Sequence, residues 1–139
     1  LEDLTVFLNS SLRWINIENC PNLKKIDTQG ANIPFIDLTH CKKLERVNIN
    51  YWNLYRKRED EFGPGFPRPI VFVIDEETRK YKYYTYYLIR VKEDSIEEKF
   101  LQKVKSMKNK MLSIAPDNFG NGVAHMYYQL IDMYESMKS

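Results

Sequence analysis

The sequence predicts an α+β protein, in which short stacked β-coils (a β-solenoid) are followed by a β-hairpin and two helices. Three observations support this fold class: an internal repeat in residues 1–53, an alternating run over residues 81–91, and helical periodicity after Ser95. Of the 139 residues, 43% are hydrophobic, which is enough apolar side chain to bury a core. The chain is therefore expected to be globular rather than disordered.

The repeat has a period of 21 residues and begins at Leu12 in its first copy and at Ile33 in its second. The recurring positions are the pairs Leu12/Ile33, Ile15/Ile36, Ile17/Leu38, Cys20/Cys41, Leu23/Leu44 and Ile26/Val47, and a half-copy starts at Leu1. Residues two apart on a strand point to the same side, so Ile15 and Ile17 are expected to point inward. Equivalent residues of successive coils should then stack in ladders about 4.8 Å apart.

A segment rich in charge, proline and glycine follows the repeat. Residues 56–61 are all charged, and residues 63–69 contain three prolines and two glycines. Proline interrupts helices and central strands, so this segment is the best candidate boundary. We expect repeat coils in residues 1–53, a Pro/Gly-rich connection in residues 54–69, and a β-hairpin plus two-helix module in residues 70–139. The last part is a candidate C-terminal cap.

Residues 1–53 resemble the short bacterial leucine-rich repeats, including those of internalin-type surface proteins. Cys20 and Cys41 fall where that signature has Asn or Cys. The sequence departs from the pattern after the second copy, where Trp52 stands in place of the small Ala31 of the preceding copy. The resemblance implies a protein-recognition surface on a secreted or cell-surface protein. Residues 70–139 carry no such resemblance.

The residues between the inward positions form the strand face that we expect to meet solvent and to bind a partner. They are Trp14, Asn16, Glu18, Phe35, Asp37 and Thr39. Stacking by one repeat places Phe35 next to Trp14, and a large apolar pair on a polar face is typical of an interface anchor. Alternatively, the two rings stack only on each other or lie beneath a preceding segment.

The cysteines and histidines belong to no strong catalytic or metal-binding motif. Cys20 and Cys41 lie one repeat apart, within the span of a disulfide, although buried free thiols are the favoured interpretation. His40 adjoins Cys41, but neither a CxxC nor an HExxH motif accompanies it. His125 is expected to be solvated. We therefore predict no catalytic residue, no metal ligand and no cofactor.

The β-hairpin is predicted from residues 70–92. Residues 70–74 form a short β-rich run, and the residues from Tyr81 to Val91 alternate in character. Tyr84 and Tyr86 share one face with basic residues, an arrangement that can stack on the bases of a single-stranded nucleic acid. Polyanion binding is therefore one alternative, although the net charge of +2 does not favour a general nucleic-acid binder.

Two helices are predicted after the hairpin. Ser95 and Glu98 have the spacing of a capping box, which marks the start of the first helix. The first helix is expected to bury Ile96, Phe100, Val104, Met107 and Met111, and the second to bury Val123, Tyr127, Leu130, Tyr134 and Met137. Lysines in the second half of the first helix complement its dipole. We expect two of them, Lys105 and Lys108, to lie far from the recognition face.

These observations together predict a non-enzymatic protein-recognition module that binds a protein or peptide and is a fragment of a bacterial surface or secreted protein. The longest apolar run has five residues, too few to span a bilayer. One alternative is a structural role, in which residues 70–139 cap a longer repeat array. The other is polyanion binding through the hairpin.

Overall fold

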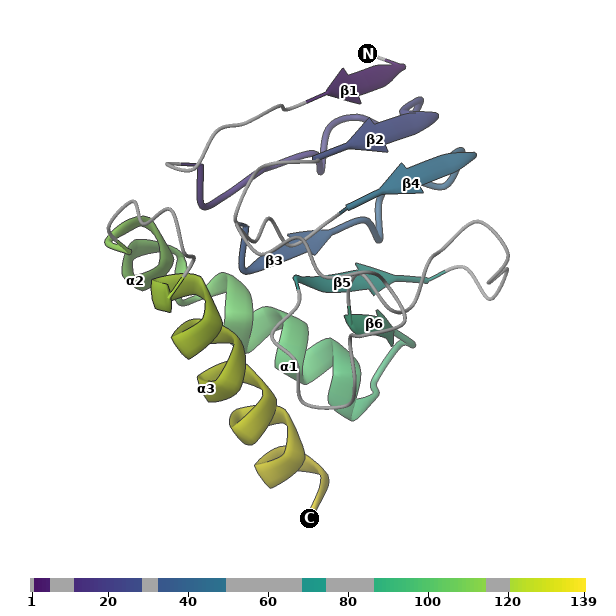
Figure 1. Ribbon diagram of the computed structural model, residues 1–139. Helices are drawn as coiled ribbons and strands as arrows, with labels where there is room; N and C mark the ends of the chain where they lie inside the picture. Colours follow the sequence, from purple (N-terminus) through teal and green to yellow (C-terminus); the bar gives the residue numbers. More distant parts are fainter. Residues whose placement is uncertain (1, 6–11, 29–32, 50–68, 75–86, 115–120) are drawn as a thin grey trace, which may run out of the picture.

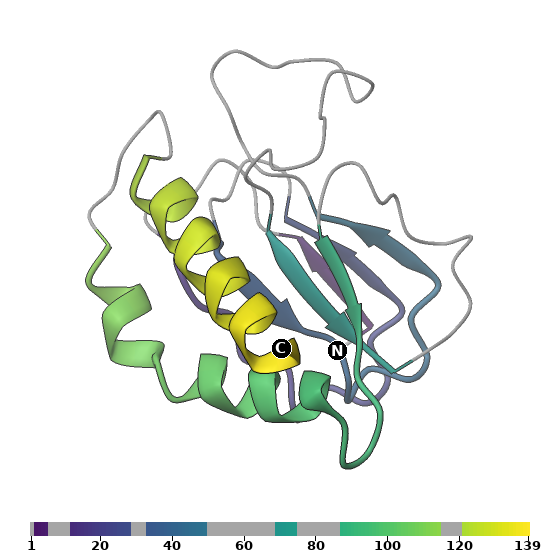
Figure 2. The ribbon, with the colours of Figure 1, turned by 90° about the horizontal axis from the view of Figure 1, so that it is seen from below.

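Figure 1 shows the computed structural model of the chain, which describes residues 2–5, 12–28, 33–49, 69–74, 87–114 and 121–139. The strands are β1 (Asp3–Thr5), β2 (Lys25–Asp27), β3 (Phe35–Asp37), β4 (Arg46–Asn48), β5 (Ile70–Val73) and β6 (Tyr87–Arg90). The helices are α1 (Ile96–Lys105), α2 (Lys108–Leu112) and α3 (Asn121–Lys138). These elements form three layers: the sheet β1-β2-β4, the sheet β3-β5-β6, and the helices (Figures 1 and 2).

The first sheet consists of three parallel strands in the order β1-β2-β4. Ile26 pairs with Leu4 on one side and with Val47 on the other, so β2 and β4 are aligned at the repeat interval of 21 residues. Ile26 and Val47 are buried, whereas the preceding residues Lys25 and Arg46 are exposed. This alternation is expected for short strands with one face on the core.

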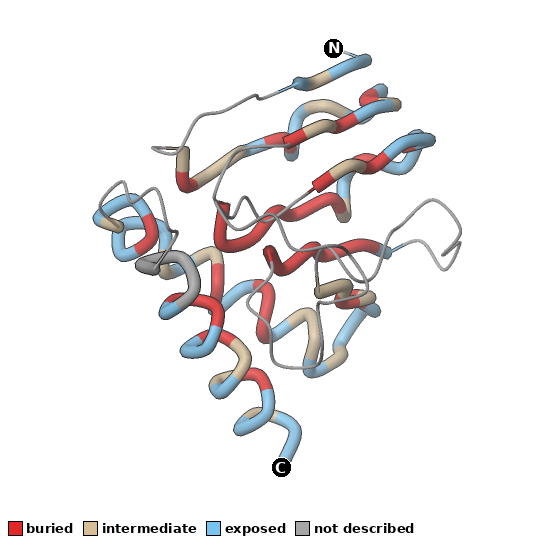
Figure 3. Tube along the Cα trace, in the orientation of Figure 1, coloured by how far each residue is buried: buried red, intermediate tan, exposed pale blue. Residues whose placement is uncertain are grey.

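The second sheet, β3-β5-β6, lies between the first sheet and the helices and is also parallel. Ile36 and Val71 belong to the core shared with the first sheet, and Phe35 and Phe72 belong to the core shared with the helices. A parallel sheet is commonly covered on both faces in this way. As a result β3 and β5 are buried along their whole length (Figure 3).

The predicted fold class is wrong. The described residues form two three-stranded parallel sheets and three helices, a mixed α/β arrangement, rather than a β-solenoid followed by a hairpin and two helices. β5 and β6 are parallel, so they cannot form a hairpin. Alternation in residues 81–91 indicates a strand but not its direction, and the segment 75–86 lies outside the described residues. β3 pairs with β5 at Phe35 and Ile70, a register that the 21-residue repeat does not contain.

Helix α1 begins where the sequence predicts. The Ser95 side chain accepts a hydrogen bond of 3.1 Å from the backbone N–H of Glu98, as a capping residue does. The predicted single helix ends at Lys105, however, and α2 starts separately at Lys108. Ile96 is 36% exposed, although it was predicted to be buried, and Leu101, which was not predicted to be buried, lies in the core.

The buried side of the helical layer otherwise follows the prediction. Phe100, Val104 and Met111 are buried in α1 and α2, and Tyr127, Leu130 and Tyr134 are buried in α3. Met107 and Met137 are half-buried against the same core. His125 is exposed, as predicted, and contacts Gln129 one turn later.

A chain of aromatic rings joins the repeat to the helices. The ring of Phe35 lies edge-on to Trp14, with 4.7 Å between ring centroids, and 6.0 Å from the ring of Phe72. Phe72 contacts Phe100 of α1 at 5.7 Å, and Phe100 stacks on Tyr134 of α3 at 4.9 Å. Such pairs stabilise a core beyond the apolar area that they bury. The residues on either side of the predicted boundary therefore share one core.

The division into residues 1–53, 54–69 and 70–139 stays a prediction, because residues 50–68 lie outside the described residues. Trp52, which departs from the repeat pattern, and Tyr84 and Tyr86, which were considered for polyanion binding, also lie outside the described residues. In the part of the chain that the structure describes, no helix has both the length and the apolar character needed to cross a membrane.

Candidate functional site

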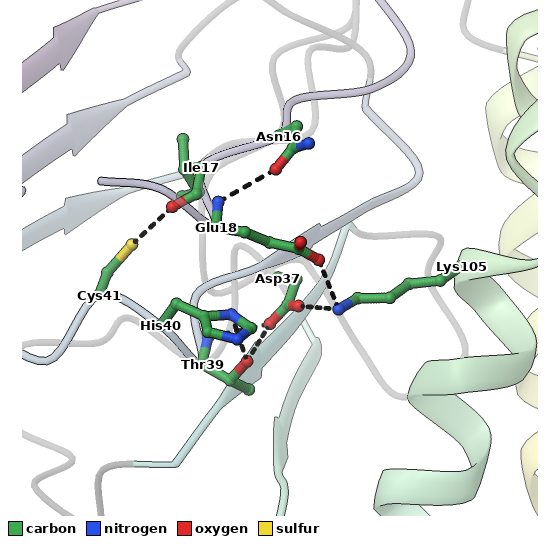
Figure 4. Close-up of polar contacts among 8 residues, drawn as sticks. All are labelled: Asn16, Ile17, Glu18, Asp37, Thr39, His40, Cys41 and Lys105. Atoms are coloured by element: carbon green, nitrogen blue, oxygen red, sulfur yellow. Dashed lines mark hydrogen bonds and ion pairs between the residues drawn. The ribbon is translucent and has the colours of Figure 1, made fainter. Parts of the chain in front are cut away.

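The site begins with a turn that both repeat copies share. Asn16 Oδ1 accepts a hydrogen bond of 3.0 Å from the Glu18 backbone N–H, and Asp37 Oδ1 accepts one of 2.9 Å from the Thr39 backbone N–H. Asn and Asp favour such turns because the short side chain can reach the backbone two residues further on. The repeat therefore fixes the side chains of residues 16 and 37 at equivalent places (Figure 4).

Lys105, the last residue of α1, reaches across to this turn (Figure 4). Its Nζ donates a hydrogen bond of 2.7 Å to Glu18 Oε1 and lies 2.8 Å from Asp37 Oδ2. Asp37 Oδ2 is buried and accepts no hydrogen bond. The contact between Lys105 Nζ and Asp37 Oδ2 is therefore an ion pair only. One ammonium group thus pairs with two carboxylates. We call Lys105, Glu18 and Asp37 the lysine clamp.

The charges of the lysine clamp stabilise one another. Burial raises the pKa of Asp37, but the ammonium group of Lys105 and the hydrogen bonds from Thr39 outweigh burial, so the pKa lies below its usual value. Burial lowers the pKa of Lys105, but Asp37 and Glu18 outweigh it and hold this pKa above its usual value. The bond from Lys105 also lowers the pKa of Glu18. All three groups are therefore charged at neutral pH.

A small groove of about 90 Å³ lies beside the lysine clamp. It is lined by Trp14, Ile15, Asn16, Ile17, Glu18, Phe35, Asp37, Lys105 and Lys108. Five of the six residues predicted to bind a partner line this groove, and the sixth, Thr39, lines a neighbouring cleft. The half-buried ring of Trp14 is a wall of the groove, and Lys108 Nζ lies 5.5 Å from the centre of that ring.

The expectation that the whole strand face is exposed is wrong. Phe35 is 3% exposed and Asp37 is 7% exposed, because the helical layer covers this face of β3. Trp14 packs against Phe35, which is one of the two alternatives given above. Of the six residues, Asn16 and Glu18 are exposed, and the Glu18 side chain is 45% exposed. The open part of the face is therefore the strip at residues 14–18.

The expectation that Lys105 and Lys108 lie far from this face is also wrong. Both line the groove, and Lys105 forms part of the lysine clamp. A lysine near the end of α1 is already explained by the helix dipole. The sequence therefore gives no sign that Lys105 contacts Glu18, which lies 87 residues earlier.

A second cleft, of about 310 Å³, lies at the carboxyl ends of the strands in the second sheet. It is lined by Thr39, His40, Ile74, Val91, Lys92, Glu93, Glu98, Leu101, Gln102 and Lys105. Lys105 therefore separates this carboxyl-edge cleft from the groove at Trp14. Of the residues that line the carboxyl-edge cleft, only Thr39 was predicted to bind a partner. The lining residues come from four separate segments of the chain, so no local sequence pattern indicates the cleft.

Glu18, Asp37 and His40 could in principle contribute ligands to a metal ion. One ligand atom from each lies within 4.8 Å of the others. The Lys105 ammonium group already lies between the two carboxylates, however, and Thr39 holds the other oxygen of Asp37. A cation would have to displace this ammonium group, so the donor set fits a metal poorly. The absence of a metal ligand stays a prediction.

The hydroxyl group of Thr39 is not an activated nucleophile. It donates a hydrogen bond of 2.6 Å to Asp37 Oδ1, but the pKa of Asp37 is lowered, which makes this carboxylate a weak base. His40 Nδ1 lies 3.4 Å from Thr39 Oγ1, a contact too long for efficient proton transfer. Thr39 therefore lacks a close contact with a strong base in this arrangement.

Both cysteines are free thiols. Cys41 is buried, and its thiol donates a weak hydrogen bond of 3.8 Å to the Ile17 carbonyl oxygen. Burial, with smaller contributions from Cys20 and Asp37, raises the pKa of the Cys41 thiol to about 11. The buried-thiol interpretation therefore describes Cys41, whereas Cys20 is half-buried.

This pKa predicts a slow alkylation of Cys41 in the native protein. The thiolate is the reactive form, and a shift of the pKa from 9.0 to about 11 reduces the thiolate fraction at pH 8 about 100-fold. Iodoacetamide labelling at pH 8, resolved by peptide mass spectrometry, should therefore be at least 100-fold slower in native than in denatured protein. Equal rates in the two states would contradict the burial of Cys41.

Comparison with models of protein families, with curated proteins and with solved structures finds no match to this chain.

Proposed function

We propose that this protein is a non-enzymatic recognition module that binds a protein or peptide partner at the groove beside Trp14. The observation that supports this proposal most directly is the composition of the groove. An aromatic wall, the polar residues Asn16 and Glu18, and two lysines meet at one place, although the lysines come from a segment far away in the sequence. Aromatic residues that are partly exposed beside charged groups are typical anchors of protein interfaces.

The similarity of residues 1–53 to short bacterial leucine-rich repeats favours the same class of function, because proteins with such repeats commonly recognise other proteins. The size of the groove is consistent with it as well. A volume of about 90 Å³ accommodates part of one partner side chain rather than a complete small-molecule substrate. The rest of the interface would then lie on the exposed strip around Asn16 and Glu18.

Replacement of Trp14 by alanine is expected to weaken partner binding about 30-fold, which corresponds to roughly 2 kcal/mol. The partner would first be captured from bacterial and eukaryotic cell extracts on the immobilised 139-residue chain, and its affinity then measured by calorimetry. Tyr128→Ala is the matched control, since Tyr128 is an aromatic residue of α3 that is 46% exposed and does not line the groove. Equal losses in the two variants would contradict the proposal.

A second pair of variants avoids any change to the core. Lys108 and Lys110 are both exposed residues of α2, but only Lys108 lines the groove. Lys108→Ala should weaken binding several-fold and Lys110→Ala should not. If Lys108→Ala and Trp14→Ala both retain full affinity while remaining folded by circular dichroism, the groove is not the binding site.

A further inference from the structure

The carboxyl-edge cleft occupies a place in the fold where parallel sheets commonly bind ligands. β3, β5 and β6 are parallel and end at Asp37, Val73 and Arg90. The residues that line the cleft follow directly after these ends, at positions 39–40, 74 and 91–93. In open parallel sheets, ligands bind outside the carboxyl ends of the strands, because side chains from several loops converge there.

The cleft has an apolar wall. Val91 and Leu101 are almost fully buried, but Ile74 is 43% exposed and is one of the few large apolar residues at the surface of the described regions. An exposed isoleucine beside two buried apolar residues offers a surface for an aliphatic chain. The cleft volume of about 310 Å³ corresponds to roughly ten water molecules, which is enough for one long side chain.

The electrostatic field of the cleft favours a cation. Glu93 and Glu98 line it, whereas the charge of Lys105 is already taken up by Glu18 and Asp37. The lining residues themselves carry two carboxylates and two ammonium groups, those of Lys92 and Lys105. With the two carboxylates that pair with Lys105 included, the six groups sum to a charge of −2. Unequal charge of this kind attracts a positively charged ligand and repels an anion.

We propose that the carboxyl-edge cleft binds the side chain of an arginine from a protein partner. The aliphatic part of that side chain packs on Ile74 and Leu101, and the guanidinium group pairs with the carboxylates of Glu98 and Glu93. Arginine suits this arrangement because its planar group forms two hydrogen bonds with one carboxylate and loses little hydration. This proposal does not depend on the groove at Trp14, which lies on the other side of Lys105.

The test uses blocked amino acids and the full-length, ¹⁵N-labelled chain. N-acetyl-arginine amide and N-acetyl-citrulline amide have nearly the same shape, but only the first is charged. Titration followed by NMR should give a millimolar dissociation constant for the arginine probe, with shifts at the amides of His40, Ile74 and Gln102. The citrulline probe should bind at least fivefold more weakly, and 0.5 M salt should weaken the arginine probe.

Glu98→Gln is the diagnostic variant and should weaken the arginine probe at least fivefold. The bond that caps α1 uses the backbone N–H of Glu98, so the substitution leaves that bond in place. Glu45→Gln is the matched control, because Glu45 is exposed and does not line the cleft. Glu93→Gln provides a second diagnostic variant if Glu98→Gln lowers the melting temperature.

Two results would overturn the proposal: equal binding of the citrulline probe, or full arginine affinity in both Glu98→Gln and Glu93→Gln. Trp14→Ala should leave binding of the arginine probe unchanged. A failure at the cleft and a failure at the groove are therefore distinguishable, because each has its own variants and its own probe.

Discussion

Replacement of Ile36 by aspartate is expected to unfold the protein. Ile36 is 1% exposed and lies in the core between the two sheets, so the substitution places an unpaired charge where no described polar group can compensate it. The expected cost exceeds about 4 kcal/mol, a large fraction of the 5–15 kcal/mol that typically stabilises a domain. Circular dichroism and chemical denaturation would measure the loss.

Ile74→Asp is the matched control for this prediction. Ile74 is also an isoleucine, but it directly follows the last residue of β5 and is 43% exposed. The same chemical change should therefore cost less than about 1 kcal/mol there. If Ile36→Asp retained the wild-type melting temperature, the inward direction of this side chain would be wrong, as it would after a shift of one residue in β3.

Replacement of Lys105 by methionine is expected to destabilise the protein by roughly 3 kcal/mol, the second-largest effect. The substitution keeps the length of the side chain but leaves the buried carboxylate of Asp37 without its counter-ion. Removal of one partner from a buried ion pair is costly because the other charge stays in a poorly solvated place. Denaturant unfolding at pH 7 would measure the change.

Two controls distinguish loss of stability through the lysine clamp from a general destabilisation of α1. Lys103→Met changes an exposed lysine two residues earlier in the same helix and should cost less than about 0.5 kcal/mol. The double variant Asp37→Asn, Lys105→Met should be more stable than Lys105→Met alone, since it removes the uncompensated charge. A double variant no more stable than the single one would show that Lys105 acts through packing alone.

The lysine clamp also predicts how stability depends on pH. The pKa of folded Asp37 lies below its ordinary value of 3.8, so its contribution is present above that pH and is lost as the pH falls further. The pKa of folded Lys105 lies above 10.5, so its contribution is lost only as the pH rises through the folded value. The cost of Lys105→Met should thus be largest near neutral pH and should shrink in acid, where Asp37 of the variant becomes protonated.

Local features of the fold could be predicted because neighbouring residues determine them. The repeat interval predicts the alignment of Ile26 with Val47, and the Ser95 cap predicts the start of α1. The two-residue periodicity separates Ile36 from its neighbours Phe35 and Asp37, which indeed face the other side of β3. In each case the signal lies within a few residues or one repeat.

The partners of β3 and of the candidate site could not be predicted in the same way. β3 pairs with β5 through backbone hydrogen bonds, which any strand can supply. The sequence therefore does not indicate which distant segment becomes the neighbour of β3. Five of the six residues of the predicted binding face line the groove. The predicted solvent exposure of this face is wrong at Phe35 and Asp37, because helices from the far end of the chain cover both residues.

Alternation along a strand depends only on backbone geometry, so the repeat pattern is enough to place Ile36 and Phe35 on opposite sides of β3. The turns at Asn16 and Asp37 are equally local, since a short side chain bonds to the backbone two residues further on, but both residues were expected on an exposed strand face instead. Long-range packing, in contrast, places the Lys105 ammonium group between Glu18 and Asp37, and between the groove and the carboxyl-edge cleft. The physical reason is that an ion pair depends on distance in space, and the burial of the aromatic chain from Trp14 to Tyr134 brings these charges together.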